Sequence, residues 1–493
     1  MPANSIDLCF LSVRELNRAY AGGELSPVEV TEAVLARIEA ENETWNALCL
    51  VDSEAARDAA RASARRWRRG ETLGPLDGIP CTVKDLVITR GWPTLRGSLT
   101  VDPQGPWLED APAVSALRQG GAVLLGKTNT PEFGSKGVTE SLLRGITCNA
   151  RDPQRAAGGS SGGAAVAAAR GYGVLHIGTD GAGSVRIPAA FNGVFALKPT
   201  FGRVPAYPLS PLGTLSHLGP ITRSVDDAAT MLSAIARYDD RDWYALPDEH
   251  QCYESHLDTS LAGWRIAYSA DLGYAEVDRE VADICRAAAH RFEELGARVE
   301  RIEGPLEEDP VWITDRIWFA AFLNITRGMD EATIARLDPM LQGMLDRARS
   351  LSTEQLLAAH SAREAVALKL CHVHRDYDLL LTPSMPLTAF RTGQFNPWGS
   401  DLPEDWIRWS SFSYPFNQSQ QPAASCPCGV DSQGLPVGLQ IVGPKYADLK
   451  VLQAAKAFEG LVSSGAVLIA PDRWPANPPG GWFQATGSAR GRP

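Results

Sequence analysis

Residues 158–200 read GGSSGGAAVAAARGYGVLHIGTDGAGSVRIPAAFNGVFALKPT. Two glycine-rich turns that carry serines, Gly158–Gly163 and Gly181–Ser184, flank the run of small residues Ala164–Ala169. Glycine adopts positive φ and lets another backbone or a ligand come close. Alanine favours helix and has little bulk, so the run predicts a helix deep in the core. Tight turns around a buried helix explain the glycines, but they do not explain why serine recurs in both turns. The two turns are therefore a candidate functional site.

The composition is that of a globular protein that does not bind nucleic acid. The 493 residues are 44% hydrophobic and 21% charged, and the net charge of −11 argues against the basic surface that nucleic acids require. Nine cysteines scattered from Cys9 to Cys428 do not form the pattern of a disulfide framework, which favours a reducing, cytoplasmic location. No signal peptide and no membrane span are expected. The oligomeric state stays open, with a homodimer among the options.

Strand-like and helix-like segments alternate along the chain. Helices are predicted over 26–41, 53–69, 113–120, 224–238, 278–295 and 448–459, and strands over 81–83, 122–125, 264–269, 298–302, 376–381 and 435–442. The first helix has a strong start signal, because Ser26, Pro27 and Glu29 form a capping-box pattern. Such alternation predicts an α/β fold with a largely parallel sheet covered on both faces.

Both serines of the first turn, Ser160 and Ser161, stand at the centre of a GxSxG pattern, which is typical of a nucleophile elbow. That elbow follows a strand and uses a downstream histidine, but residues 151–157 are polar and loop-like. His372 and His374 lie downstream on a predicted helix, where most histidines have ordinary structural roles. An esterase of the α/β-hydrolase type is therefore a remote alternative.

Two other patterns lack the context that their chemistry needs. Gly121–Thr128 matches the phosphate-loop pattern, but its four middle residues, Ala-Val-Leu-Leu, are themselves a predicted strand. The pairs Cys426/Cys428 and His372/His374 have no companion pair at the spacing of a zinc site, and Pro427 favours a turn. Neither a nucleotide nor a metal ion is expected.

A serine hydroxyl needs a neighbouring base to act as a nucleophile. Without histidine, the remaining base is a neutral lysine, and burial lowers the pKa of a lysine. Lys84 follows the predicted strand Cys81-Thr82-Val83, so its amine is a candidate for burial at the end of that strand.

These residues resemble the amidase signature family, and the similarity covers nearly the whole chain. The motifs are GIPCTVKD (Gly78–Asp85), GKTNTPEF (Gly126–Phe133), GGSSGG (Gly158–Gly163), GTDGAGSVR (Gly178–Arg186), KPTFG (Lys198–Gly202), GPIT (Gly219–Thr222) and LPVGLQIVGP (Leu435–Pro444). The resemblance implies an α/β/α fold in which helices cover both faces of a large, twisted, mixed sheet. It implies a Ser–cis-Ser–Lys triad of Ser184 as nucleophile, Ser160 beside a cis peptide bond as proton relay, and Lys84 as base. It also implies an oxyanion hole formed by the N–H groups of Gly181, Ala182, Gly183 and Ser184.

The sequence departs from the family pattern at two positions. Ala182 stands where the family commonly has glycine, and its Cβ restricts the turn. Ala157 stands where proline usually precedes GGSSGG. Neither change removes a catalytic group.

By this resemblance, residues 1–476 form a single domain with its core at about 65–235 and 421–470. A substrate-side elaboration is expected over 305–420, and a flexible tail over 477–493. The aromatic-rich elaboration is expected to supply most of the substrate pocket, through Trp312, Trp318, Phe319, Trp398, Trp406, Trp409, Phe412, Tyr414 and Phe416.

The expected activity is hydrolysis of neutral amides such as anilides, with esters and carbamates (urethanes) as further substrates and no cofactor. The alternative within the family is the amidase component of a glutamyl-tRNA(Gln) amidotransferase, which works with a partner protein. Thr130–Phe133 (TPEF) looks more like stand-alone hydrolases.

Overall fold

The computed structural model describes residues 7–464, and the expected tail at 477–493 lies outside them. An eleven-stranded sheet runs through the molecule in the order β1-β3-β2-β6-β8-β7-β12-β13-β11-β9-β10. Its strands are β1 (Leu48–Val51), β2 (Pro80–Lys84), β3 (Val123–Thr128), β6 (Leu175–Asp180), β7 (Phe195–Lys198), β8 (His217–Thr222), β9 (Arg265–Tyr268), β10 (Arg298–Arg301), β11 (Leu379–Pro383), β12 (Ala423–Val430) and β13 (Pro436–Val442). A separate small hairpin joins β4 (Glu140–Ser141) to β5 (Gly145–Ile146).

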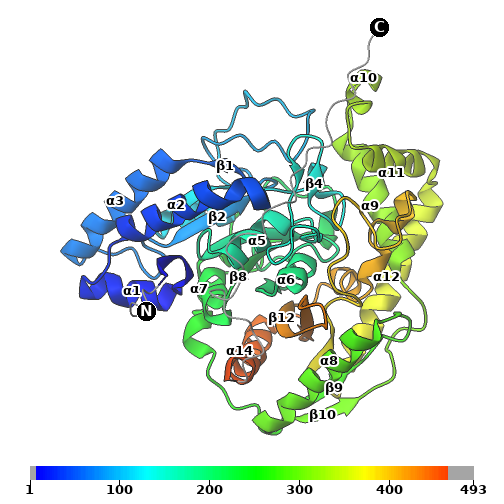
Figure 1. Ribbon diagram of the computed structural model, residues 1–493. Helices are drawn as coiled ribbons and strands as arrows, with labels where there is room; N and C mark the ends of the chain where they lie inside the picture. The colour runs from blue at the N-terminus through cyan, green and yellow to red at the C-terminus, as the bar shows by residue number, and fades with distance from the viewer. Residues whose placement is uncertain (1–6, 465–493) are drawn as a thin grey trace.

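Helices surround this sheet (Figure 1). They are α1 (Val13–Gly22), α2 (Pro27–Trp45), α3 (Ser53–Arg69), α4 (Pro112–Gln119), α5 (Gly162–Arg170), α6 (Arg186–Asn192), α7 (Val225–Ile235), α8 (Arg279–His290), α9 (Val311–Ile325), α10 (Glu331–Ile334), α11 (Pro339–Ser350), α12 (Thr353–Val373), α13 (Pro415–Gln418) and α14 (Asp448–Ser464). The capping box predicted at Ser26 is present, because the Ser26 side chain and the Glu29 side chain each accept from the other residue's N–H.

The sheet is mixed rather than largely parallel. Only four of its ten strand pairings are parallel, β2 with β3, β2 with β6, β9 with β10, and β9 with β11. The prediction from alternation was wrong because it missed the antiparallel strands β7, β8 and β12 in the middle of the sheet. The mixed sheet implied by the family resemblance is confirmed.

β12 shows why one of these strands was missed. Proline in a strand removes a donor from the ladder and normally signals an edge strand or a turn. Pro427 nevertheless lies inside β12, and the register shifts between Pro427 and Gly429. The pairing of β12 with β7 ends at Ser425, so at Pro427 the strand is paired with β13 alone, and the turn expected at Cys426-Pro427-Cys428 is a strand.

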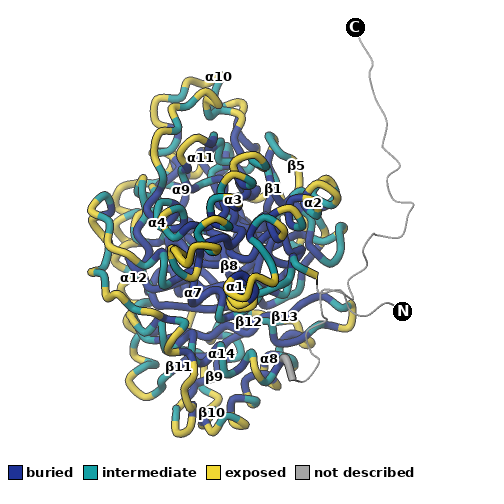
Figure 2. Tube along the Cα trace, turned by 90° about the vertical axis from the view of Figure 1, so that its left-hand side faces the viewer, coloured by how far each residue is buried: buried dark blue, intermediate teal, exposed yellow. Residues whose placement is uncertain are grey.

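Alternate residues of the strands enter two different hydrophobic clusters. In β3, Leu124 belongs to the hydrophobic cluster that also contains residues of α4, α7 and α14, whereas Val123 and Leu125 belong to the cluster that contains residues of α2, α3 and α5. Neighbouring strand residues point to opposite faces, so both faces of the sheet are covered. Figure 2 shows the resulting buried centre beneath partly exposed outer helices.

α5 is the helix predicted from the alanine run, and each of its residues is buried. It begins at Gly162, directly after the first serine turn, and α6 begins at Arg186, directly after the second. Both serine turns thus lie at helix starts in the interior. Among residues 7–464, no helix is long and apolar enough to cross a membrane.

Candidate active site

Lys84 is the last residue of β2 and is fully buried. Its Nζ lies 2.7 Å from Ser160 Oγ, 2.9 Å from Ser161 Oγ and 2.8 Å from Thr179 Oγ1. Thr179 stands near the end of β6, and β2 and β6 are parallel neighbours. The ends of two parallel strands therefore bring the predicted lysine to the first serine turn.

Burial lowers the pKa of Lys84 well below its usual value, and the negative charge of Asp180 opposes this only in part. Desolvation disfavours the charged form of a buried amine. The neutral amine is the form that can accept a proton.

The three hydroxyls around Nζ are not equivalent. A neutral amine has two N–H groups and one lone pair, so one of the hydroxyls must donate to it. Ser161 Oγ already donates its proton to the main-chain oxygen of Thr179, at 3.0 Å. This leaves the hydroxyl of Ser160 or Thr179 to donate to Lys84.

The first serine turn is held by its main chain. The peptide bond between Gly159 and Ser160 is cis. Thr139 Oγ1 donates to the oxygen of Gly158 at 2.8 Å and accepts from the N–H of Gly162 at 2.9 Å. These bonds fix the turn on both sides of Ser160.

The second turn adjoins the first. The N–H of Ser161 donates to the main-chain oxygen of Ser184, at 3.1 Å. Ser160, Thr179 and Ser184 line the same cavity. The structure thus brings together Lys84, Ser160 and Ser184, the three residues expected from the sequence.

Asp180 organises the second turn, and this role was missed by the sequence analysis. It forms a fully buried ion pair with Arg186 at 3.0 Å and accepts from the N–H of Gly183 at 2.7 Å and of Val185 at 3.2 Å. Burial alone would raise the pKa of the Asp180 carboxyl, but the charge and hydrogen bonds of Arg186 outweigh it and hold the pKa below its usual range. The sequence did contain a signal for this ion pair, because Asp180 and Arg186 stand six residues apart on either side of the glycine turn.

The N–H groups of the second turn differ in their availability. Within residues 7–464, the N–H groups of Gly181, Ala182 and Ser184 have no hydrogen-bond acceptor. The N–H of Gly183 is occupied by Asp180, so the expectation that Gly183 donates to an oxyanion is wrong for this structure. Gly183 has a conformational role instead, because its φ is 123° and a Cβ there would lie 2.4 Å from the Ser413 side chain.

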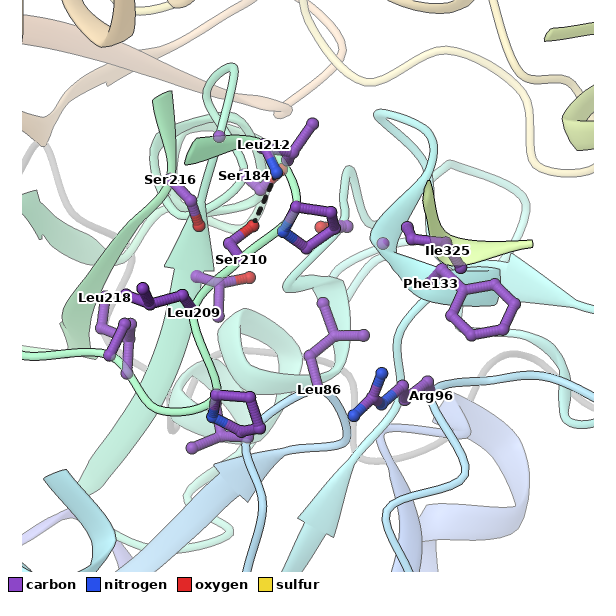
Figure 3. A pocket seen from close by; sticks show the side chains of 18 of the residues that line it. Leu86, Arg96, Phe133, Ser184, Leu209, Ser210, Leu212, Ser216, Leu218 and Ile325 are labelled. Atoms are coloured by element: carbon purple, nitrogen blue, oxygen red, sulfur yellow. Dashed lines mark hydrogen bonds between the residues drawn. The ribbon is translucent and has the colours of Figure 1, made fainter. Parts of the chain in front are cut away.

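A cavity of about 590 Å³ opens at the serines (Figure 3). Its walls come from the loop that follows β2, from the segment 206–218 and from the end of α9. Most lining side chains are apolar, and Arg96 is the one charged side chain among the described residues that line it. An apolar hollow with a few polar groups is typical of a small-molecule site.

The pocket does not come mainly from residues 305–420, so that prediction was wrong. Of the nine aromatic residues named for it, only Trp318 lines the cavity. The others pack mostly with one another and with the core, as in the stack of Trp318 on Trp406 and the contacts of Trp409 with Phe191 and Phe390. The proline-containing segment 206–218 contributes more of the wall, and its turn residues were the signal for a functional loop.

The family model for amidases matches residues 29–452 of the chain. The chain belongs to the amidase signature family. It is 37% identical to an acylamidase of Rhodococcus erythropolis over 92% of this chain and 96% of that protein. It is 35% identical to a glutamyl-tRNA(Gln) amidotransferase component of Moorella thermoacetica over 92% of this chain and 97% of that protein. Among solved structures, a bacterial aryl acylamidase of the amidase signature family has a TM-score of 0.85 and 31% identity, over 92% of this chain and 96% of that chain.

The GxSxG turn lies in this site, but the histidine, phosphate-loop and metal features of the competing interpretations do not. No histidine is among the described residues that line the cavity. Residues Gly126-Lys127-Thr128 of the phosphate-loop pattern are part of strand β3. Among residues 7–464, no group of three or more histidine, cysteine or acidic residues could hold a metal ion.

The two departures from the family pattern are accommodated. Ala182 has no positive φ, so its Cβ causes no backbone strain in this turn. Ala157 is buried, and its main-chain oxygen accepts from the Asn192 amide at 2.8 Å. That hydrogen bond ties the start of the first turn to α6.

Proposed function

We propose that this amidase is a hydrolase that cleaves C–N bonds through an acyl-enzyme on Ser184. The observation that carries the proposal is the position of Lys84 Nζ, 2.7 Å from Ser160 Oγ, beneath two adjoining serine turns that open into one cavity. A buried amine beside a hydroxyl supplies the base that a serine nucleophile needs.

The proposed first half-reaction follows from the proton positions. Ser184 Oγ attacks the carbonyl carbon while its proton passes to Ser160 Oγ, and the Ser160 proton passes to Lys84 Nζ. The N–H groups of Gly181, Ala182 and Ser184 are proposed to stabilise the oxyanion. Losing one such donor in other enzymes costs about 3–4 kcal/mol.

Collapse of the tetrahedral intermediate breaks the C–N bond. The proton returns from Lys84 through Ser160 to the leaving nitrogen, so the amine departs neutral. Water then attacks the acyl-enzyme by the same relay and releases the carboxylic acid. Every proton taken up by Lys84 is returned within each half-reaction, which is why no further acid is required.

The proposed substrates are amides with an apolar group, such as anilides, with esters and carbamates as further substrates. The mainly apolar cavity supports a bulky substrate, and the similarity to an acylamidase and an aryl acylamidase supports an acyl-aryl amide. All nine cysteines are free, which supports the proposal of a cytoplasmic location.

A second candidate function is favoured by the 35% identity to an amidotransferase component. In such a complex, the protein would act only with a partner protein. Purification under native conditions separates the two proposals, because the hydrolase would be active as this chain alone.

The proposal is tested with a panel of anilides, primary amides, esters and carbamates. The purified wild type should release amine or alcohol from at least one class, and Ser184→Ala should release none. A fluorophosphonate should label Ser184 in the wild type. Absence of both hydrolysis and labelling would refute the proposed function.

A further inference from the structure

The cavity contains a cation that the proposed reaction does not use. Arg96 lines it, and in Figure 3 its guanidinium points toward Leu86, with Ser184 on the other side of Leu86 in that view. The remaining lining side chains among the described residues are uncharged. A half-buried positive charge in a mainly apolar cavity is costly unless something pairs with it.

Arg96 has no ion pair within residues 7–464 and no side-chain hydrogen bond there. The acid whose charge acts on Arg96 is Asp85, and its carboxylate has other partners. Asp85 lies 3.4 Å from Lys127 Nζ and accepts from the N–H of Gly97 at 3.4 Å. The guanidinium therefore keeps its donors free for a group that enters the cavity.

The main chain at Arg96 is held in an unfavourable conformation. Its φ is 55°, which is uncommon for a residue with a long side chain. The N–H of Phe133 donates to the main-chain oxygen of Arg96 at 2.8 Å, and a Cβ on Gly97 would lie 2.6 Å from the oxygen of Thr130. Such strain persists only where the surroundings fix it, and it often marks a functional position.

We propose that Arg96 binds a carboxylate of the substrate, at a distance from the bond that is cleaved. The inference rests on the proposed amide hydrolysis and narrows its substrate class to amides that carry a carboxylate in the acyl or the amine part. A guanidinium donates two parallel hydrogen bonds to a carboxylate, which gives both strength and orientation. Arg96 would thus place the scissile carbonyl against Ser184.

This inference replaces the expectation of a neutral substrate. That expectation came from the net charge of −11, which describes the whole chain. The charge among the described residues that line the cavity has the opposite sign. Local charge, rather than net charge, determines what a desolvated site accepts.

The test compares matched substrates. 4-Acetamidobenzoate and 4-acetamidoacetophenone carry the charged or neutral group on the amine part, and succinanilic acid and 4-oxopentananilide carry it on the acyl part. The ratio of kcat/KM for the charged member to that for the neutral member is measured in wild type and in Arg96→Gln. Dividing the two ratios cancels the difference between leaving groups.

We expect this ratio to fall at least tenfold in Arg96→Gln for one of the two pairs, and the pair that responds identifies the part that carries the carboxylate. The ratio should fall less in Arg96→Lys, because lysine keeps the positive charge but cannot donate two parallel hydrogen bonds. Glutamine, lysine and arginine are all unbranched at Cβ, so the strain at φ 55° is matched among them. Arg61→Gln removes one charge from an exposed residue outside the cavity and should leave the ratio unchanged.

An unchanged ratio for both pairs in Arg96→Gln would overturn the inference. If that variant does not fold, benzoate and acetophenone are compared as protectants of wild-type Ser184 against a fluorophosphonate. Protection by benzoate at a tenfold lower concentration supports the inference, and equal protection overturns it. A wild type that hydrolyses only the neutral members refutes the inference alone, whereas failure of both hydrolysis and labelling refutes the proposed function.

Discussion

Nζ of Lys84 lies 2.7 Å from Oγ of Ser160 at a point where the two residues are 0% and 2% exposed. Bulk water therefore cannot carry the proton between them, and the pH dependence of activity should report on this pair. The proposed base is the neutral amine, and burial lowers the pKa of Lys84. Activity should fall as the pH drops through that lowered pKa, and kcat/KM against pH measures it.

Substitutions of Lys84 and of a second buried lysine, Lys198, should have different effects on activity. Lys84→Arg should be inactive at every pH, because a guanidinium does not lose its proton in a protein. Lys198 is also fully buried, with a pKa lowered by burial, but its Nζ donates to the main-chain oxygens of Pro199 and Gln421 rather than to a serine. Lys198→Met should reduce stability and leave the pH profile of the remaining activity unchanged. Activity in Lys84→Arg would show that Lys84 is structural.

Ser184→Ala is expected to lower kcat by about 10⁴-fold or more, because the proposed acyl-enzyme forms on the Ser184 hydroxyl. Ser210→Ala is the matched control. Ser210 lines the same cavity, but within the described part of the chain its hydroxyl accepts only from the N–H of Leu212, at 3.3 Å (Figure 3). The control should stay within about tenfold of wild type. Mass spectrometry of the labelled peptide locates the fluorophosphonate, and a label on Ser160 or Ser161 would contradict the assignment.

Asp180→Asn should destabilise the fold as well as the site. Removing one partner of a buried ion pair leaves the other charge uncompensated, which costs about 3–5 kcal/mol. The exposed pair Arg61–Asp58 supplies the control, and Asp58→Asn should change the free energy of unfolding far less. Urea denaturation at pH 7 compares the variants. A loss for Asp180→Asn no larger than for the control would contradict the argument.

The Asp180 carboxyl also gives a pH dependence with a definite sign. Its pKa in the folded protein lies below the ordinary value of 3.8. The unfolded chain therefore binds the proton first as the pH falls. The stability from this group is fully present above pH 3.8 and is lost progressively as the pH falls through the folded-state pKa.

The sequence predicted the elements that have strong local signals. Helix α3 was predicted with its observed bounds, Ser53–Arg69, since Gly70 ends it in the left-handed conformation. The two serine turns and Lys84 were located because their motifs are long and ordered. The occupation of the Gly183 N–H by Asp180 could not be predicted, because it depends on the conformation of one turn rather than on residue types. The prediction of the residues that line the pocket was wrong for a related reason, because an aromatic residue such as Trp406 fits a core as well as a cavity.

The volume of the cavity should limit the size of the substrate. Anilides with acetyl, butyryl and hexanoyl groups should show kcat/KM rising with chain length, because each buried methylene contributes about 0.8 kcal/mol until the cavity is full. Ile325 lines the cavity at the end of α9, whereas its neighbour Leu323 is 38% exposed and does not line it.

Ile325→Trp should therefore stop the rise at a shorter chain and leave the acetyl substrate nearly unaffected, since the added ring occupies space that only longer chains use. Leu323→Trp should follow the wild-type series. A flat wild-type series would show that the acyl chain does not enter the cavity. If Ile325→Trp lowers kcat/KM equally for the acetyl and the hexanoyl substrate, the substitution disturbs the serines rather than limiting the length of acyl chain that fits.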